Sequence, residues 1–231
     1  MAYTPPPQLT IRSTLGVSVN NGVKMMVYGL AGSGKTRLCA TAPRPIILSA
    51  ENGLLSLNNQ DIPFIQINTL EELQAARVQI HNDKRFDTVC LDSASDIAER
   101  VLQHRMATNK DPRKAYGEMA QEVLNEVRMF RDFPQRHVLF IMKQGKFVDQ
   151  STGVPMWGPL MPGQQLDQHM PYMFDELFQL VSWMDGNGQR QSWLRTQRDN
   201  QNEAKDRSGR LDQWEPANLT HIINKISGMA A

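Results

Sequence analysis

Short apolar runs alternate with helix-like segments along most of the chain. In the helix-like segments the apolar side chains recur every three or four positions, the spacing of a helix that buries one face. The runs predict strands at residues 23–28, 46–49, 64–67, 86–91 and 137–142, and the periodic segments predict helices at 69–81, 96–107, 116–133 and 216–227.

The order of these elements predicts an α/β fold. Strands separated by helices over the first 144 residues imply a mostly parallel, twisted sheet with helices on both faces. Two further runs, at 176–183 and 191–196, flank the turn Asp185-Gly186-Asn187-Gly188. Because such a turn is typical of hairpins, we expect antiparallel strands at one edge of the sheet.

The length and the proline content suggest how the chain is divided. Its 231 residues suffice for one sizeable α/β domain and are too few for two large ones. Residues 1–20 contain three consecutive prolines, at positions 5 to 7, and then a mixed polar stretch. We therefore expect an extended N-terminal arm at 1–20 and a single core domain at 21–231.

The most informative motif follows the first predicted strand. Residues 29–36 satisfy the spacing G-x-x-x-x-G-K-[ST] at every fixed position. In this phosphate-binding P-loop, backbone N–H groups surround phosphate oxygens, the lysine reaches the β- and γ-phosphates, and the hydroxyl residue ligates Mg²⁺. We therefore predict a site for ATP and Mg²⁺, with Thr36 as a metal ligand. Its residues are Gly29, Leu30, Ala31, Gly32, Ser33, Gly34, Lys35, Thr36 and Arg37.

Composition narrows the class of protein. The net charge is +1, so any contact with a nucleic acid must come from a local patch. Cys39 and Cys90 lie in apolar segments without metal-ligand spacing, which indicates buried, reduced thiols. No apolar run approaches the roughly 18 residues of a membrane span. The start of the chain does not resemble a signal peptide, and we expect a soluble, cytoplasmic protein.

Two acidic residues follow predicted strands. Asp92 ends the run 86–91 and fits a Walker B role in the metal shell, although a strand-end aspartate also caps helices. Glu51 follows the strand at 46–49. Because ligand sites of parallel sheets lie at the carboxyl ends of the strands, Glu51 and Asp92 should face the same crevice as Lys35. A surface-loop glutamate remains the alternative for Glu51.

The pairs Ala50-Glu51 and Asp92-Ser93 resemble the RecA family. In that family a strand ending in Ala-Glu supplies the catalytic glutamate, and the Walker B strand ends in Asp-Ser. The resemblance implies that Glu51 activates the attacking water, a step that ATP hydrolysis requires. It also implies that Gln144, after the strand at 137–142, senses the γ-phosphate and signals to a DNA-binding loop.

Two segments are candidates for single-stranded DNA contact. The Gly/Pro-rich stretch 145–163 carries Lys146, Phe147 and Trp157, and a mobile loop with a cation and aromatic rings suits DNA phosphates and bases. A lid or an interdomain surface is the alternative. The second segment occupies the place of the first DNA loop in RecA-like proteins, but it can also be a solvated face. Its basic residues are Arg105, Lys110, Arg113 and Lys114.

The segment 204–209, Ala-Lys-Asp-Arg-Ser-Gly, resembles the Lys-Asn-Arg-Phe-Gly motif of RadA-type members of this family. The resemblance implies that Lys205 and Arg207 reach the γ-phosphate on a neighbouring subunit, as an arginine finger does. Arg195 and Arg198 are weaker candidates. A flexible, solvated loop is the alternative.

Taken together, the order of these motifs resembles the phage-encoded RecA-like single-strand annealing proteins, or minimal core recombinases. That resemblance implies an ATPase that coats single-stranded DNA, promotes annealing or strand pairing, and assembles as a ring or filament with ATP between subunits. It also implies a bacterial host cell and a possible single-strand binding protein as partner.

Three other classes of protein remain open. A small-molecule kinase could use the basic residues at 105–114 as a lid. A non-enzymatic module could use nucleotide binding only to gate assembly with a partner. An AAA+ protein is disfavoured, because its Walker B strand usually ends in adjacent acidic residues and it needs a C-terminal helical lid.

Overall fold

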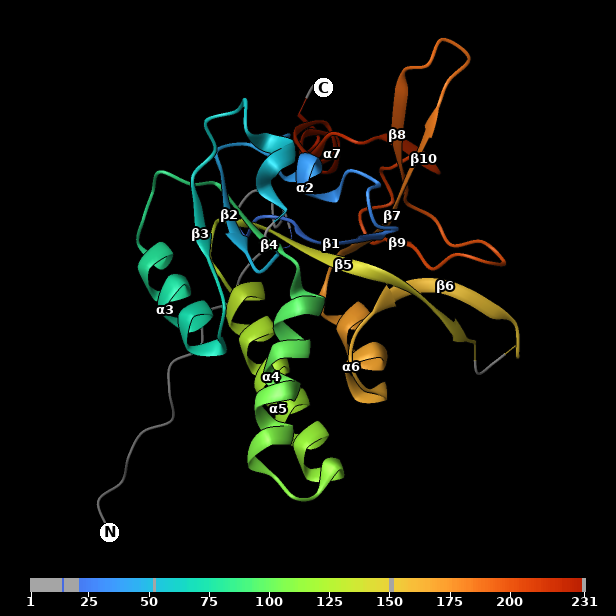
Figure 1. Cartoon of the computed structure of the whole chain (residues 1–231). Coiled ribbons are helices and arrows are strands. Elements are labelled where there is room, and N and C mark those ends of the chain that lie inside the picture. Colours follow the sequence, from blue (N-terminus) through green and yellow to red (C-terminus); the bar gives the residue numbers. More distant parts are fainter. Residues whose placement is uncertain (1–13, 15–20, 52, 150–151, 230–231) are drawn as a thin grey trace, which may run out of the picture.

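The computed structural model describes residue 14 and residues 21–51, 53–149 and 152–229. The described residues form one ten-stranded sheet in the order β10-β8-β7-β1-β5-β4-β2-β3, with β6 paired to β5 and β9 to β7 (Figure 1). The parallel strands are β1 (Lys24–Gly29), β2 (Pro45–Ser49), β3 (Phe64–Gln66), β4 (Thr88–Asp92), β5 (His137–Val148) and β7 (Glu176–Met184).

Four antiparallel strands complete the sheet on the side of β7 and beside β5. The predicted hairpin is present, since β7 pairs with β8 around the turn that the sequence indicated. The α/β fold with a mostly parallel sheet and antiparallel edge strands is therefore confirmed. The antiparallel strands are β6 (Pro155–Leu160), β8 (Arg190–Arg195), β9 (Lys205–Asp206) and β10 (Trp214–Pro216).

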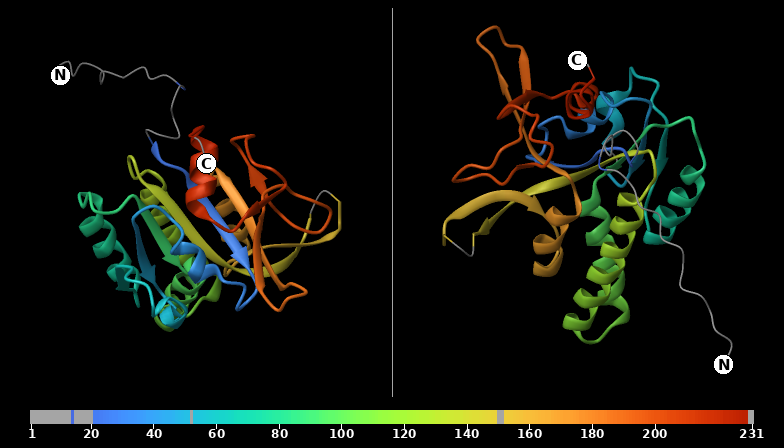
Figure 2. Two further views of the ribbon diagram at one scale, coloured as in Figure 1. Left: turned by 90° about the horizontal axis from the view of Figure 1, so that it is seen from above. Right: turned by 180° about the vertical axis from the view of Figure 1, so that it is seen from behind.

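Helices cover both faces of the sheet, as the views from above and from behind in Figure 2 show. One buried cluster joins alternate strand residues, such as Met26 and Phe140, to the larger helical layer. The other joins Met25 and Ile141 to the opposite layer. The larger layer is α3 (Leu70–His81), α4 (Ala94–Thr108), α5 (Pro112–Arg131) and α6 (Gln164–His169) followed by η2 (Met170–Met173); the smaller is α2 (Lys35–Cys39), η1 (Leu54–Leu57) and α7 (Leu219–Ser227).

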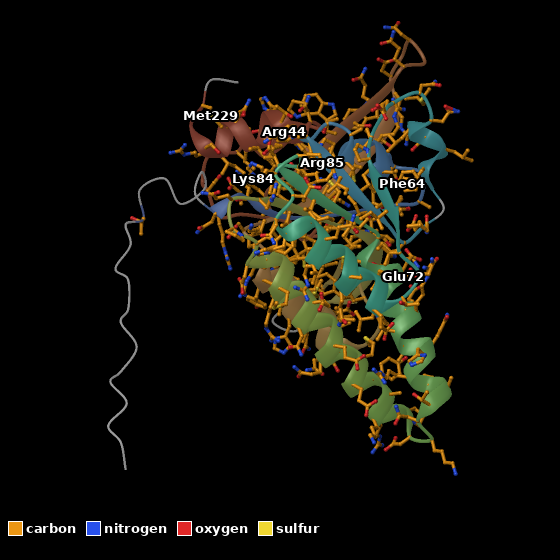
Figure 3. The ribbon with its side chains drawn as sticks, turned by 90° about the vertical axis from the view of Figure 1, so that its left-hand side faces the viewer. Arg44, Phe64, Glu72, Lys84, Arg85 and Met229 are labelled. Atoms are coloured by element: carbon orange, nitrogen blue, oxygen red, sulfur yellow. The ribbon has the colours of Figure 1, made fainter. Side chains whose placement is uncertain are left out.

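Local signals account for the helix boundaries. Glu72 N donates to Thr69 Oγ1 at 3.2 Å, so Thr69 is the N-cap of α3 as its spacing from Glu72 predicts. Figure 3 shows Glu72 at one end of this helix, and Lys84 and Arg85 beyond the other. Both cysteines are buried free thiols, as expected.

The prediction of a mobile loop at 145–163 was wrong for most of that stretch. Strand β5 continues to Val148 and pairs with β6 in register, so that Lys146 faces Trp157. The Lys146 ammonium lies 4.6 Å from the centre of the Trp157 ring. The glycine and proline content suggested an irregular backbone here. Instead, pairing with β6 supplies hydrogen-bond partners for the backbone N–H and C=O groups of β5. The predicted N-terminal arm lies outside the described residues except for Thr14, so its extent stays a prediction.

Candidate functional site

The P-loop joins the end of β1 to α2 at the carboxyl edge of the sheet. Gly32 and Gly34 have φ angles of +72° and +101°, a left-handed conformation that glycine adopts without strain. A Cβ placed on either glycine would meet no other heavy atom within 4 Å. The loop is therefore open on the side where a ligand would approach.

Lys35 points back across this loop. Its Nζ donates to the carbonyl oxygens of Gly29 and Leu30, both at 2.9 Å, and the side chain is half-buried. Burial lowers the pKa of Lys35 below its ordinary value, and the nearby carboxylates of Glu51 and Asp92 oppose that shift. Because two neutral carbonyls hold the ammonium group, an anionic phosphate oxygen is a stronger partner for it.

Thr36 and Asp92 form the second part of the site. Thr36 Oγ1 donates to Asp92 Oδ2 at 2.6 Å, although the two residues are 56 positions apart. Asp92 is only 3% exposed, and burial raises the pKa of its carboxyl against the effect of this hydrogen bond. The predicted pair, from the start of α2 and the end of β4, is thus brought together.

These residues suit the Mg²⁺–nucleotide that the fold implies. The hydroxyl of Thr36 and the carboxylate of Asp92 are oxygen ligands of the kind that Mg²⁺ prefers. In the middle of the loop, the buried Oγ of Ser33 has no hydrogen-bond partner among the described residues. An orphaned polar atom and two open glycines in one loop are consistent with a bound polar group.

Glu51 lies where β2 leaves the sheet. The N–H groups of Ala50 and Glu51 both donate to the carbonyl of Asp92, at 2.6 Å and 3.2 Å, which ties the end of β2 to the end of β4. A Cβ built on Gly53 would lie 3.8 Å from Glu51 Oε2 and 3.9 Å from Thr36 Oγ1. The carboxylate and the hydroxyl therefore border the same space.

Asp96 and Lys143 complete a chain of charged groups that the sequence analysis missed. Burial, followed by a hydrogen bond to Asp96, raises the pKa of Glu51 to about 7. Asp96 in turn lies 3.0 Å from the Nζ of Lys143 on β5. The cap formed by Asp96 N and Ser93 Oγ, at 3.3 Å, was visible as a Ser-x-x-Asp spacing, but its closeness to Glu51 was not.

Gln144 lies beside the P-loop. Lys143 is level with Gly29 in the register of β5 and β1, so Gln144 is the next residue beyond the sheet's carboxyl edge. Its side chain lines a cavity of about 310 Å³ together with P-loop residues, Ser182 and Arg190. The predicted position of Gln144 near the phosphate loop is consistent with this geometry, while its sensing role stays a prediction.

Arg190 is a third residue that the sequence analysis missed. Its Nη2 donates to the carbonyl of Gly32 in the P-loop and, at 2.8 Å, to Ser182 Oγ on β7. The sequence indicated the hairpin that carries Arg190, but no local signal shows that this hairpin lies against the P-loop.

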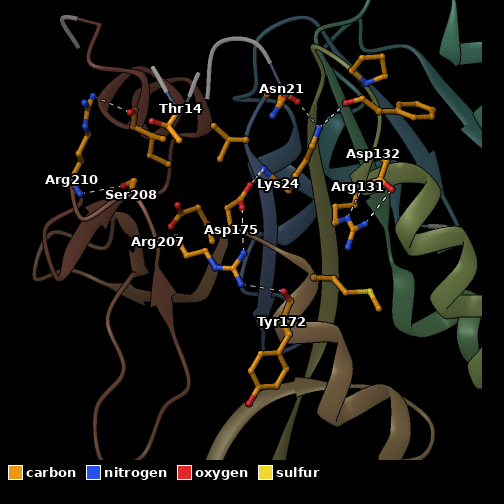
Figure 4. A pocket seen from close by; sticks show the side chains of 17 residues that line it. Thr14, Asn21, Lys24, Arg131, Asp132, Tyr172, Asp175, Arg207, Ser208 and Arg210 are labelled. Atoms are coloured by element: carbon orange, nitrogen blue, oxygen red, sulfur yellow. Dashed lines mark hydrogen bonds and ion pairs between the residues drawn. The ribbon is translucent and has the colours of Figure 1, made fainter. Parts of the chain in front are cut away.

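Lys205 and Arg207 lie at the opposite, amino edge of the sheet. Lys205 is on β9, which pairs with the first residues of β7, and its Nζ donates to the carbonyls of Pro171 and Phe174 at 2.6 Å and 2.7 Å. Arg207 donates to the Tyr172 carbonyl at 3.2 Å and lines an open cavity of about 1050 Å³ (Figure 4). Neither residue is near its own P-loop.

Intramolecular partners occupy the two weaker arginine candidates. Arg195 forms an ion pair with Asp199, and its guanidinium lies 4.3 Å from the centre of the Trp214 ring. Arg198 forms an ion pair with Asp149.

The candidate DNA-contact residues belong to two separate elements. One group lies around the connection between α4 and α5, where Arg105 pairs with Glu122 and Lys114 lies 3.7 Å from Glu118. Lys110 and Arg113 are exposed there. Lys146 and Phe147 lie instead on the β5–β6 hairpin, which Figure 1 shows extending away from the α4–α5 pair, with α6 between them.

No helix within the described part of the chain is long and apolar enough to cross a membrane. Among solved structures, the fold is similar to a KaiC-like protein from the archaeon Pyrococcus horikoshii OT3, with 12% sequence identity and a TM-score of 0.45 over 82% of this chain and 88% of that chain. No curated protein matches the sequence.

Residues 21–208 match a protein family described as AAA domain. The sequence analysis disfavoured an AAA+ protein because Asp92 is followed by serine and because that class needs a C-terminal helical lid; the description of the matching family is AAA domain. The predicted mostly parallel sheet is the observed one, with β5 between the P-loop strand β1 and the Asp92 strand β4. The chain belongs to the AAA domain family, and its core is a P-loop domain of the ATPase type.

Proposed function

We propose that this protein binds ATP with Mg²⁺ at the carboxyl edge of its sheet and hydrolyses it in the course of binding single-stranded DNA and promoting annealing or strand pairing. The observation that carries the ATPase part is the meeting of Thr36, Asp92 and Glu51 beside the P-loop. The DNA part rests on the sequence resemblance to phage recombinases and on the position of the β5–β6 hairpin.

The P-loop residues bind and orient the nucleotide. Backbone N–H groups around Gly32 and Gly34 face phosphate oxygens, and Lys35 exchanges its two carbonyl partners for phosphate oxygens. Thr36 and Asp92 hold the metal, which neutralises the negative charge that the phosphates carry. Because Asp92 is buried, its carboxylate is fixed in direction before the ligand arrives.

Glu51 is the proposed general base. It accepts a proton from the attacking water at a carboxylate oxygen, so it must be deprotonated when the reaction begins. Asp96 competes for the same proton and is itself held by Lys143 at 3.0 Å. This arrangement positions the Glu51 carboxylate and ties it to β5, the strand that carries Gln144.

The β5–β6 hairpin is the proposed route to DNA. Gln144 is followed on the same strand by Lys146 and Phe147, and Trp157 lies across from Lys146. An exposed lysine stacked on the half-buried ring of Trp157 offers a cation for a DNA phosphate beside an aromatic ring for a base. The basic residues between α4 and α5 would extend the contact.

Assembly is proposed for the amino edge. Arg207 is exposed, and its ion pair with Asp175 is long, at 3.5 Å. A neighbouring subunit's nucleotide could therefore exchange for Asp175 as the partner of Arg207. Lys205 is half-buried whereas Arg207 is exposed, so of the two candidates Arg207 is the better placed for contact between subunits in a ring or filament.

The kinase alternative loses support from the position of the basic segment. Helix α4 starts at the carboxyl edge and carries the chain away for 15 residues, which is about 22 Å at a rise of 1.5 Å per residue. The residues from Arg105 to Lys114 thus lie at the far end of α4 and the start of α5, and they do not line the cavities beside the P-loop.

Steady-state ATP hydrolysis with and without single-stranded DNA tests the proposal. We expect DNA to stimulate hydrolysis, Lys35→Ala to abolish nucleotide binding, and Glu51→Gln to retain binding but lose turnover. Lys84→Ala, an exposed residue near the amino edge, is the matched control. Hydrolysis by a folded sample that DNA leaves unchanged would contradict the DNA role, and annealing that persists in Glu51→Gln would favour nucleotide-gated assembly.

A further inference from the structure

Arg190 places a cation on the P-loop from a distant part of the chain. It is the first residue of β8, 158 positions after the Gly32 carbonyl that its Nη2 contacts. Both hydrogen bonds of the guanidinium, to Gly32 and to Ser182 Oγ, use Nη2. Within the described part of the chain, Nε and Nη1 have no hydrogen-bond partner, and the side chain is exposed. Most of the donors of this guanidinium are therefore free for a ligand.

The charge of Arg190 is not neutralised within the described residues. Arg195 and Arg198, on the same strand and in the loop after it, have carboxylate partners in Asp199 and Asp149. Arg190 instead has a carbonyl and a hydroxyl. A guanidinium can donate two parallel hydrogen bonds to two oxygens of one phosphate. Such a charged pair is stronger than a hydrogen bond to a neutral carbonyl.

Lys35 provides an internal reference for this arrangement. It is the P-loop lysine, whose partner in the motif is a phosphate, and here it contacts the carbonyls of Gly29 and Leu30. Arg190 contacts the carbonyl of Gly32 in the same loop. Two cationic side chains that are far apart in the sequence, Lys35 and Arg190, thus donate hydrogen bonds to carbonyls of the same P-loop.

Two cavities beside the P-loop meet at Arg190. One, of about 290 Å³, is lined by Gly34 and Arg37; the other, of about 310 Å³, is lined by Gly32 and Gln144. Arg190 borders both of them. A nucleotide whose phosphates follow the loop therefore passes within reach of this guanidinium.

The β7–β8 hairpin holds Arg190 at this place. Arg190 pairs with Met184 at the end of the ladder, and Asp185 Oδ1 accepts hydrogen bonds from Asn187 N and Gln189 N, both at 2.9 Å. Gln191 Nε2 donates to the other oxygen of Asp185 at 2.9 Å. The turn is thus fixed by its own side chains, so little order has to be gained when a ligand binds.

We propose that Arg190 is a phosphate-binding residue of the nucleotide site, supplied by the same chain through the β7–β8 hairpin. On binding of a nucleoside di- or triphosphate, its guanidinium exchanges the Gly32 carbonyl for phosphate oxygens. This inference rests on the proposed function, because it requires that the P-loop binds a nucleotide.

Calorimetric titration with a non-hydrolysable ATP analogue and with inorganic tripolyphosphate tests the inference. We expect Arg190→Ala to weaken the binding of both ligands by about 10- to 100-fold, the value of a hydrogen-bonded charge pair. The affinity of Arg190→Lys should lie between those of the natural chain and Arg190→Ala, because lysine keeps the charge but cannot donate two parallel hydrogen bonds. Arg85→Ala is the control, since Arg85 is an exposed arginine paired with Asp83 beyond the end of α3 (Figure 3).

The outcomes separate this inference from the proposed function. Weaker binding of the analogue with unchanged binding of tripolyphosphate means that Arg190 contacts the nucleoside, which overturns the inference. Unchanged binding of both ligands in Arg190→Ala, while Lys35→Ala loses them, also overturns it and leaves the proposed function standing. If Lys35→Ala binds nucleotide normally, the proposed function fails first. A thermal melt of each variant confirms that it is folded.

Discussion

Two lysines at opposite edges of the sheet make the same kind of contact with different results. At the amino edge, Lys24 Nζ donates to the carbonyls of Asn21, Phe133 and Arg136 at 2.8, 2.9 and 2.6 Å, and the side chain is 5% exposed. At the carboxyl edge, Lys35 donates to two carbonyls of the P-loop and is half-buried.

The difference teaches that burial, and not residue type or partner type, separates a structural cation from a ligand-binding one. Lys24 joins the start of β1 to the connection between α5 and β5, and burial lowers its pKa to about 8. Three carbonyls hold its ammonium group. Lys35 lies on a loop whose glycines leave open space. We therefore expect phosphate oxygens to replace the two carbonyls that its ammonium group contacts.

The largest expected effect is on ligand binding at the carboxyl edge. Lys35→Ala should weaken nucleotide binding by about 100-fold or more, because the variant loses a charged partner of the phosphates, and should change the free energy of unfolding little. Calorimetry and urea unfolding of the same sample give the two numbers. If stability falls as much as affinity, Lys35 is structural and the contrast with Lys24 disappears.

Lys24→Met reverses that pattern. Removing the ammonium leaves three carbonyls without their donor, and we expect a loss of about 3 kcal/mol in the free energy of unfolding. Nucleotide affinity should not change. Urea denaturation measures the loss, with the exposed Lys84→Met as control. If Lys24→Met lowers the free energy of unfolding by less than Lys84→Met does, water satisfies the three carbonyls as well as the ammonium group does.

His137 predicts how the amino edge responds to acid. Its Nδ1 accepts from Val23 N at 3.0 Å, and burial followed by the charge of Lys24 lowers its pKa to about 4. The unfolded chain, with an ordinary histidine pKa of about 6.5, binds the proton first as pH falls. The contribution of His137 to stability is therefore lost between about pH 6.5 and pH 4, by about 1 to 3 kcal/mol.

Urea unfolding at several pH values checks this window. His137→Asn keeps an acceptor for Val23 N and cannot take up the proton, so its stability should fall less on acidification. His104→Asn, at an exposed position on α4, should behave as the natural chain does. Parallel pH profiles for the natural chain and His137→Asn would refute the histidine as the cause.

Arg207 carries the smallest expected effect on stability. Its ion pair with Asp175, at 3.5 Å, is exposed, so Arg207→Ala should change the free energy of unfolding by less than about 1 kcal/mol. Hydrolysis by assembled protein should nevertheless fall, whereas nucleotide binding by dilute protein should not. Hydrolysis that stays normal at every protein concentration would remove the proposed role between subunits.

The two edges also differ in how far the sequence predicts them. The P-loop, Asp92 and Glu51 follow predicted strands directly, so local spacing and the rule for parallel sheets were enough to place them together. The contacts of Lys205 with Pro171 and Phe174 depend on how β9 pairs with β7, which no local pattern shows.

Long-range register explains the remaining differences. Arg190 reaches Gly32 only because β7 is the neighbour of β1 in the sheet. The β5–β6 hairpin forms because β6 (Pro155–Leu160) pairs with the end of β5, inside the stretch that the sequence predicted to be a loop. Asp96 was visible as a helix-capping residue, yet its approach to Glu51 depends on β2 and β4 being adjacent. The catalytic, sensing and DNA-binding roles stay predictions until they are measured.

The length of β5 has a mechanical consequence. It is a continuous strand of 12 residues, about twice the usual length, and it leaves the body of the sheet without a break. Alternate side chains share a face, so Gln144 beside the P-loop and Lys146 on the hairpin point the same way, about 7 Å apart along the strand. One uninterrupted strand therefore joins the residue beside the P-loop to the tip of the hairpin, with no loop between them.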